Sequence, residues 1–296
     1  MKKHPILGLI SIVLAGTMMN AEAITIAHGG DSVDIEFVDI GNVGNTGDTA
    51  VAGYGAVDYE YSIGKFEVTA DQWAAVIAAD SVVGNAGNWS GSQPTASSSW
   101  YEAAKFANWL TSGDALQGAY GFSNATTFTG VDRATALTTY GTIYVLPTED
   151  EWYKAAYLKS DGSGYTLYAT GDSVPTAGTD ANYNGANTAP WNVGSGSVEN
   201  NGTYDMGGNV WEWGESAFSG GEPTGGESRV LRGGIWGDRF LLKSSGQGAT
   251  LPDNETNNLG FRVASVSAAV AAVPEPSSVG LLVIGAMGCM LRRKRG

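Results

Sequence analysis

Short stretches in which apolar and polar residues alternate open the region beyond residue 33. Ile35 and Phe37 precede a loop rich in glycine and asparagine, and Tyr61 and Ile63 follow that loop. Alternation with a period of two is typical of strands that bury one face. The pattern therefore predicts a strand, a loop and a second strand over residues 34–65.

Three amphipathic helices are predicted next, each marked by a capping box. In this motif a hydroxyl side chain accepts a hydrogen bond from the backbone amide three residues further on. The acid or amide side chain of that residue in turn accepts a hydrogen bond from the backbone amide of the first. The three pairs are Thr69 with Gln72, Ser99 with Glu102, and Thr148 with Glu151. Trp73 and Ile77, and likewise Phe106 and Leu110, are four residues apart and share a helix face. We expect these faces to enter the core.

The stretch from Gly162 to Gly226 is rich in Gly, Asn, Ser and Thr and has few apolar periods. Its backbone polar groups must find partners in turns, side chains or a bound ion rather than in long ladders. Residues 34–264 contain no Pro/Ser-rich linker and no evident internal repeat. We therefore treat them as one folded unit.

The N-terminal segment has the pattern of a cleavable export signal. Lysines follow the first methionine, an apolar stretch covers residues 6–14, and Ala21 and Ala23 frame a small-residue cleavage site. Such a stretch is too short to cross a membrane as a permanent helix. We interpret residues 1–23 as a signal peptide removed by signal peptidase, with a mature chain that starts near Ile24. A buried N-terminal helix or strand is the alternative.

The C-terminal segment combines three features. An apolar run covers residues 279–291, and as a helix it would be about 20 Å long, against roughly 30 Å of bilayer hydrocarbon. This length argues against an ordinary permanent span, although terminal cations would hold an inserted end in the cytoplasm. The flanking residues are Pro274, Glu275 and Pro276 before the run and Arg292, Arg293, Lys294 and Arg295 after it.

This order of features closely resembles the PEP-CTERM sorting signal. In that family an exosortase of the inner membrane recognises and removes the segment. The resemblance implies transient membrane insertion, export across the inner membrane of a Gram-negative bacterium, and sorting to the envelope, outer surface or extracellular matrix. A plain tail anchor is the alternative. We assign residues 274–296 to the sorting tail and residues 265–273 to a linker.

The part between the two end segments is strongly acidic. From Ile24 to Pro276 the chain holds 10 of the 16 basic residues and 29 of the 30 acidic ones, which leaves a net charge of about −19. Such a surface argues against nucleic acid or anionic lipid as a partner. It is compatible with divalent cations, although simple solvation explains most of these charges equally well.

Sulfur and imidazole are nearly absent from this part. Cys289, the only cysteine, lies in the tail, and the two histidines are His4 in the signal and His28 near the mature start. The domain therefore has no thiolate metal site, no thiol nucleophile and too few imidazoles for a zinc or iron centre. A Ser-His-Asp triad would depend on His28 alone.

Four segments occur in a family-like order. They are Ile63-Gly-Lys-Phe-Glu-Val-Thr69, Leu146-Pro-Thr-Glu-Asp-Glu-Trp152, Tyr204-Asp-Met-Gly-Gly-Asn-Val-Trp-Glu-Trp213, and Leu231-Arg-Gly-Gly-Ile-Trp236 followed by Leu259-Gly-Phe-Arg262. Together they resemble the formylglycine-generating enzyme (sulfatase-modifying factor) family over residues 34–264. The resemblance implies an α+β fold, an irregular C-type-lectin-like arrangement with short strands, about three helices and little regular secondary structure.

The same resemblance implies structural calcium. The first site would use the Asp205 side chain, the carbonyls of Met206, Gly208 and Val210, and Glu212. Calcium takes six to eight oxygens in a forgiving geometry, which carboxylates and turn carbonyls supply. The alternative is a self-capped turn in which a carboxylate pairs with a nearby arginine.

A second calcium site would use Asn182 and the carbonyl of Tyr183, and its other ligands would fall in a shortened stretch. We expect Arg232 and Arg262 to lock loops through carboxylate or carbonyl bonds. We expect the remaining motif aromatics to be core residues: Trp211, Trp213, Trp236 and Phe261.

The family's catalytic residues are not matched. The oxygen-dependent enzymes need a pair of cysteines after the Arg-Gly-Gly segment, where thiolates bind copper. The corresponding residues 237–248 contain no sulfur, and Asp and Lys cannot replace soft ligands for Cu(I). We therefore assign no catalytic residue and expect no copper site.

Three functions remain open from the sequence. The first is a non-catalytic, calcium-stabilised, lectin-like module that binds an extracellular glycan, an exopolysaccharide or a surface protein. The second is a structural matrix protein without a discrete ligand. The third is an enzyme that uses carboxylates such as Glu149, Asp150 or Asp238. We favour the first and lean against an enzyme.

Overall fold

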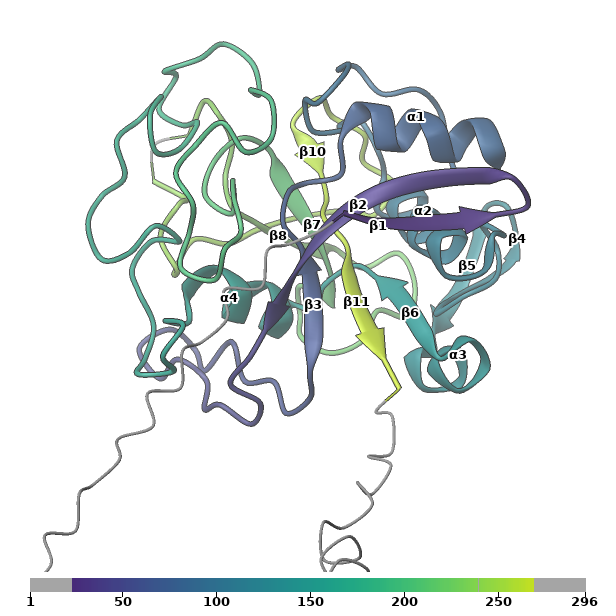
Figure 1. Cartoon of the computed structure of the whole chain (residues 1–296), viewed down its shortest axis with the longest axis horizontal. Coiled ribbons are helices and arrows are strands. Elements are labelled where there is room, and N and C mark those ends of the chain that lie inside the picture. Colours follow the sequence, from purple (N-terminus) through teal and green to yellow (C-terminus); the bar gives the residue numbers. More distant parts are fainter. Residues whose placement is uncertain (1–22, 239, 269–296) are drawn as a thin grey trace, which may run out of the picture.

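A five-stranded sheet brings together strands from the two ends of the folded chain (Figure 1). The structure is a computed structural model that describes residues 23–238 and 240–268. All neighbours in the sheet are antiparallel, and β11 lies between β3 and β6. In sheet order the strands are β1 (Ala23–His28), β2 (Asp31–Ile40), β3 (Tyr61–Gly64), β11 (Ala264–Ser267) and β6 (Thr142–Val145). The predicted pair of strands over residues 34–65 is thus confirmed as β2 and β3.

A second, four-stranded sheet carries the motif segments of the C-terminal half. Its order is β10 (Leu259–Gly260), β7 (Trp211–Ala217), β8 (Arg229–Arg232) and β9 (Gly248–Thr250). Strands β10 and β7 are parallel and the other neighbours antiparallel. A separate hairpin is formed by β4 (Tyr120–Asn124) and β5 (Thr127–Val131).

The three capping boxes all begin helices. These are α1 (Ala70–Ala79), α2 (Trp100–Ser112) and α4 (Glu149–Tyr157), and in each box both reciprocal bonds are present. A fourth helix, α3 (Arg133–Tyr140), was not predicted. It has an Asp132 cap but no capping box, and Ala136 is its only buried residue, so the sequence shows no apolar stripe.

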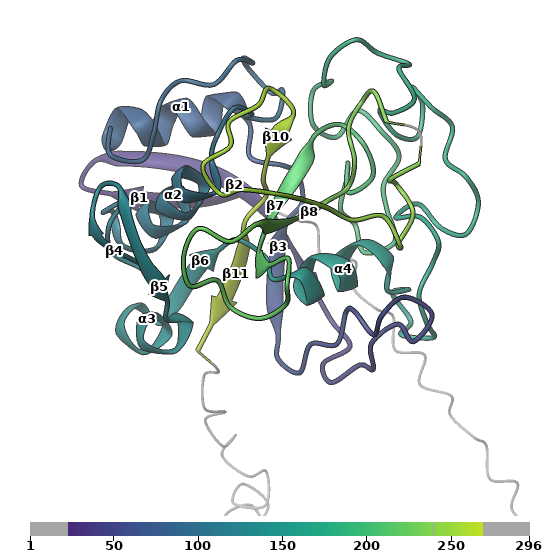
Figure 2. The same ribbon diagram turned by 180° about the vertical axis from the view of Figure 1, so that it is seen from behind.

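The two sides of the domain differ in regularity. Helices α1, α2 and α3 cover one side, and irregular loops form the other (Figures 1 and 2). Isolated bridges apart, the described chain has no helix or strand between Tyr157 and Trp211. The expected loop region therefore ends at β7 rather than at Gly226. The reason is that Trp211–Ala217 pairs with both β8 and β10.

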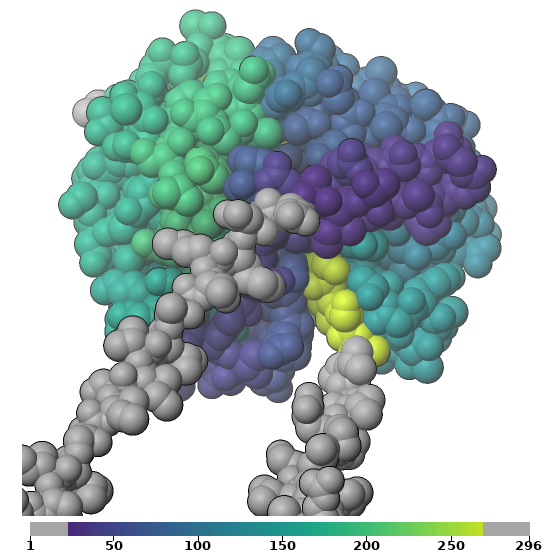
Figure 3. Space-filling model, viewed as in Figure 1, coloured from purple at the N-terminus to yellow at the C-terminus, as the bar shows by residue number. Residues whose placement is uncertain are grey.

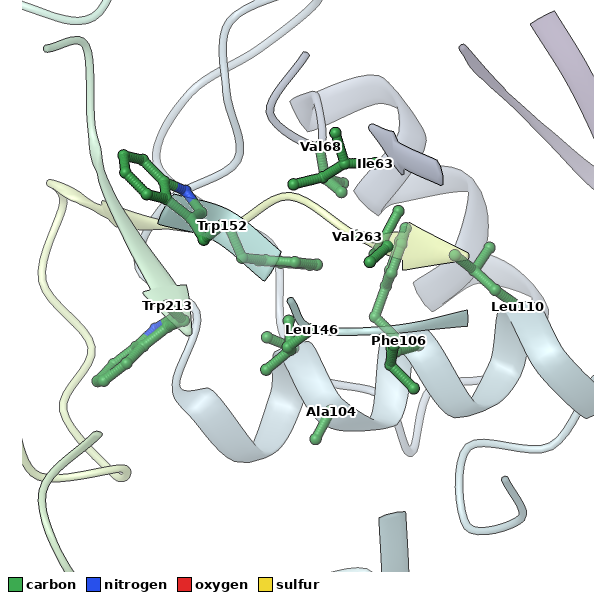
Figure 4. Close-up of a cluster of buried hydrophobic side chains, with 14 of the residues drawn as sticks. Ile63, Val68, Ala104, Phe106, Leu110, Leu146, Trp152, Trp213 and Val263 are labelled. Atoms are coloured by element: carbon green, nitrogen blue, oxygen red, sulfur yellow. The ribbon is translucent and has the colours of Figure 1, made fainter. Parts of the chain in front are cut away.

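One large hydrophobic core lies between the sheets and the helices (Figure 4). Ile63, Trp152 and Trp213 reach it from β3, α4 and β7, and Leu146 reaches it from the segment after β6; all four are fully buried. Trp73 stacks on Phe106 with ring centroids 5.6 Å apart, as the apolar faces of α1 and α2 predicted. Within the described ranges, none of the helices is long and apolar enough to cross a bilayer.

The described strands reach into two of the expected end segments. Ser265, Val266 and Ser267 belong to β11, where they pair with β6, so the linker expected from residue 265 starts inside a strand. Ala23, expected at a cleavage site, is the first residue of β1. Ala21 and the whole expected sorting tail lie outside the described residues.

We predict that the cap of α2 contributes measurably to stability. Ser99 is buried, its hydroxyl accepts the Glu102 amide, and Glu102 bonds back to the Ser99 amide at 2.9 Å. Ser99→Ala should lower the free energy of unfolding by about 1–2 kcal/mol in urea titrations. The matched control is Thr139→Ala on exposed α3, where a change within about 0.5 kcal/mol is expected. Equal effects of the two substitutions would contradict the role of the cap.

Candidate functional site

A tight turn before β7 carries the residues expected to bind calcium. Asp205 and Asn209 both have positive φ, at 61° and 60°. Gly208, at φ 96°, lies against the 182 loop so closely that a Cβ atom would be 2.3 Å from the Asn182 carbonyl oxygen. Only glycine allows this approach. The Asn209 amide donates to the same carbonyl at 2.8 Å, so the structure brings the two expected calcium segments together.

The Asp205 carboxylate is bound by donors of its own chain. Trp191 Nε1 donates to Oδ1 at 2.8 Å, and the Gly194 amide donates to Oδ2 at 2.7 Å. Asp205 is buried, and burial raises its pKa above the ordinary value. The carboxylate therefore attaches the 191–194 loop to the turn.

Glu212 forms a buried ion pair. Arg262 Nε lies 2.7 Å from its Oε2 and Nη2 lies 2.6 Å from its Oε1, while Trp152 Nε1 also donates to Oε2 at 2.7 Å. Both charged side chains are fully buried. A two-point arginine–carboxylate contact of this kind is strong and directional. It is the arginine pair that the sequence left open as the alternative to a calcium ligand.

The residues expected at the second site form hydrogen bonds within their own loop. Asn187 Nδ2 donates to Asn182 Oδ1 at 3.0 Å, and the Tyr183 carbonyl accepts the Ala186 amide at 3.2 Å. Asn182 in turn donates to Asn209 Oδ1 at 3.1 Å. The Asn182 side chain therefore stabilises the loop, and calcium at this second site stays a prediction.

The full first ligand set does not fit calcium in this arrangement. Glu212 faces a guanidinium, which would repel a cation at the same oxygens. Among residues 23–238 and 240–268, no group of three or more His, Cys, Asp and Glu is placed to hold a metal. The carbonyl oxygens of Met206 and Val210 do converge near Gly233, at 3.3 and 3.7 Å from where its Cβ would be. Calcium at Asp205 and these carbonyls remains a prediction.

Two further buried acids lie beside the turn, and neither was predicted to belong to the site. Glu67 Oε2 accepts from Asn209 at 3.0 Å, whereas its Oε1 is buried without a hydrogen-bond partner. Burial raises the pKa of Glu67 well above its usual value, and Asp205 and Glu212 add to the effect. Glu67 lies between Phe66 and Val68 in the first motif segment, and this apolar context was the available signal.

Glu199 is the second of these acids. Its Oε2 accepts the Thr203 hydroxyl at 3.0 Å and the Met206 amide at 3.2 Å. Burial raises the pKa of Glu199 to about 8, although the charge of Arg262 opposes the shift. Glu199 therefore holds its proton at neutral pH, which removes one negative charge from a crowded interior.

The two motif arginines lock loops, as expected. Arg262 Nη1 donates to the Gly64 carbonyl at 2.9 Å, and Nη2 donates to the Tyr204 carbonyl at 2.9 Å. Arg232 pairs with Glu149, and its Nη1 donates to the carbonyls of Ser244 and Gly246. Trp213 and Phe261 are buried as expected, but Trp211 and Trp236 are partly exposed. Trp236 lies on a loop rather than inside the core, which corrects that expectation.

A second charged network was also missed. Arg133 Nη1 bonds to Glu151 at 2.8 Å and its Nε lies 2.9 Å from Glu215, while Tyr59 and Tyr120 donate to these carboxylates. Burial alone would raise the pKa of Glu151, but Arg133 and the surrounding donors lower it below its usual value. The network depends on the unpredicted helix α3, so local sequence patterns could not reveal it.

The sequence of this chain matches known families along most of its length. A model of the sulfatase-modifying factor enzyme 1-like domain matches residues 16–266, and one of the PEP-CTERM protein-sorting motif matches residues 272–295. The chain belongs to the sulfatase-modifying factor family. Its sorting motif marks it as an exosortase-sorted surface protein of a Gram-negative bacterium.

Three solved structures share the fold. Treponema denticola variable protein 1 has a TM-score of 0.59 at 23% identity, covering 82% of this chain and 98% of that one. CarF has a TM-score of 0.59 at 24% identity and covers 78% and 97%. PvdO from Pseudomonas aeruginosa has a TM-score of 0.56 at 18% identity and covers 83% and 98%. The family's C-type-lectin-like fold is thus confirmed, and residues 23–238 and 240–268 form four helices rather than about three.

One curated relative aligns over a short stretch. The inactive C-alpha-formylglycine-generating enzyme 2 of Mus musculus is 40% identical over 72 residues, which is 22% of each chain. The alignment therefore spans about a fifth of that relative's length. This short alignment therefore supports the shared domain and not the activity of the whole relative.

We predict that Glu199 makes stability depend on pH. Its pKa is about 8 in the folded domain and near 4.5 in the unfolded chain. The folded state therefore binds more protons between these values, and the free energy of unfolding should fall as pH rises from about 4.5 to about 8. Urea titrations in excess chelator would measure this slope. Glu199→Gln should reduce this slope, whereas the exposed Glu60→Gln should leave it unchanged. An unchanged slope in Glu199→Gln would contradict the assignment.

Calcium at the Asp205 turn is tested by thermal unfolding. An ion held only by the folded state must stabilise it. We expect a higher Tm in millimolar calcium than in excess chelator, with magnesium as the control for general ionic effects. An identical Tm under both conditions would remove calcium from the account of this fold.

Proposed function

We propose that this protein is a non-catalytic binding module that is exported and displayed on, or released from, the cell surface. The observation that carries the proposal is the segment after β8. In the family's oxygen-dependent enzymes this segment bears the cysteine pair. Here residues 237–248 contain neither cysteine nor histidine.

The arrangement of that segment supports the proposal. Arg232 Nη1 donates hydrogen bonds to the Ser244 and Gly246 carbonyls of this segment, at 3.0 and 2.7 Å. The Ser244 amide donates to the Leu167 carbonyl at 2.9 Å. The segment is thus a structural turn bonded to two other parts of the chain. The oxygen and amine groups of its side chains are hard ligands, which do not suit Cu(I).

Carboxylate catalysis receives no support from the geometry. Glu149 is buried and paired with Arg232. Asp150 accepts the Gly55 amide at 2.8 Å, and the Asp238 carboxylate accepts the Phe240 amide at 2.9 Å. Each acid therefore has a structural partner, and the three belong to different environments. The name of the mouse relative describes it as inactive, which agrees with a family member that lacks catalysis.

The ligand class follows from location and surface. An exosortase-sorted protein meets extracellular glycans, exopolysaccharide and the proteins of its own envelope. A domain that presents long Gly- and Asn-rich loops on one side offers many exposed amide groups to such ligands (Figure 2). In this proposal any calcium at the Asp205 turn stabilises those loops and takes no part in a reaction.

We predict that the purified protein does not generate formylglycine. A cysteine-containing sulfatase peptide would be incubated with protein, copper, reductant and oxygen and analysed by mass spectrometry. An oxygen-dependent family enzyme that has the cysteine pair is the positive control. We expect unmodified peptide, because no thiolate is available to bind copper. Formylglycine in the peptide would overturn the non-catalytic assignment.

A further inference from the structure

Two long stretches of this acidic chain contain no charged residue. They cover residues 81–101 and residues 181–198, and both consist mainly of Asn, Gly, Ser, Thr, Ala and aromatic residues. Charged residues make up 16% of the chain, so stretches of this length stand out. The domain around them carries most of the 30 acids.

The fold places these two stretches side by side. Gln93 Nε2 donates to the Pro190 carbonyl at 2.8 Å, and the Val193 amide donates to the Ser92 carbonyl at 2.9 Å. The blue segment after α1 and the green loops accordingly meet at the upper edge of the molecule (Figure 3). Two uncharged stretches about 100 residues apart in sequence therefore lie against each other.

A pair of tryptophans lies at these two stretches. The rings of Trp89 and Trp236 have centroids 5.9 Å apart and planes at 88°, so they form a right-angled corner. Both side chains are partly exposed. Trp89 Nε1 donates to the Asn257 carbonyl at 2.9 Å, and the Trp236 carbonyl accepts the Gly185 amide at 2.8 Å. The corner is therefore fixed in place by both neighbouring loops.

Polar but uncharged side chains surround the corner. The exposed polar residues on the contributing loops include Asn88, Ser90, Ser92, Asn184, Asn187 and Asn257. The segments that carry Trp236 and Asn257 also contain charged residues, among them Asp238 and Glu255. We call the Trp89–Trp236 pair with these side chains the tryptophan corner.

We propose that the tryptophan corner binds a neutral polysaccharide, and this inference rests on the proposed function as a binding module. The C–H-rich face of a pyranose ring packs against an indole, a large rigid surface that loses little entropy on binding. Amide and hydroxyl side chains can donate to and accept from sugar hydroxyls. Each of these groups is present at the corner.

The absence of charged residues from the two stretches favours a neutral ligand. An acidic polysaccharide or a nucleic acid needs Arg or Lys opposite its anionic groups, and the two stretches provide none. A cationic ligand would be drawn to the acidic remainder of the domain instead. A neutral polymer gains no electrostatic attraction from the acidic surface, so it is the ligand class for which binding at these uncharged stretches costs no charge interaction.

The test is affinity electrophoresis of the exported, processed protein in gels containing hydroxyethyl cellulose, dextran or galactomannan, with alginate as the acidic comparison. We expect retardation by at least one neutral polymer and none by alginate. Trp89→Ala and Trp236→Ala should each weaken binding about tenfold. Trp89→Tyr should retain most of it because a ring remains. Phe218→Ala, which removes an exposed aromatic from the end of β7, should leave binding unchanged.

Three results would overturn the inference: no retardation by any neutral polymer, retardation by alginate alone, or equal binding by the alanine variants at unchanged Tm. A parallel assay on the producer's isolated envelopes separates this failure from that of the proposed function. Envelope binding that survives both alanine substitutions would reject the tryptophan corner and keep the binding module. Absence of any envelope binding by the unaltered protein would reject both.

Discussion

The buried pair of Arg262 and Glu212 is the contact on which the rest of the structure depends. Arg262 reaches carbonyls at the end of β3 and before the Asp205 turn, while Glu212 also accepts from Trp152 of α4. One guanidinium thus joins both sheets, a helix and the irregular loops. Taking two charges out of water is costly, so removal of either partner would leave the other uncompensated. The Gly-Phe-Arg and Trp-Glu-Trp motifs supply these two partners.

The acids around this pair exceed the charge that one arginine can balance. Glu67, Glu199 and Asp205 lie within the same interior, and burial raises the pKa of each. Hydrogen bonds from Asn209, Thr203 and Trp191 hold them in place. Protonation of these acids and hydrogen-bond donors of the chain therefore stabilise the interior. A bound cation would offset the same excess of negative charge.

This buried network has consequences at the surface. Through Trp191 and Asn209 it holds the 182–194 loop, whose backbone also meets Trp236. The Asp205 turn thus holds the 182–194 loop, which contains no strand, through hydrogen bonds. The same sheet carries Arg232, which shapes the segment where related enzymes place thiols.

Local chemistry alone determined much of this protein. The capping boxes located three helices, alternation located β2 and β3, and residue content excluded thiol and multi-histidine chemistry, because each depends on neighbouring residues or on composition. Helix α3, the partners of Glu212, and the buried Glu67 and Glu199 required the tertiary structure. A carboxylate in a turn has the same local pattern whether it meets a metal or an arginine. Only the approach of Arg262, 50 residues away, decided which partner Glu212 has.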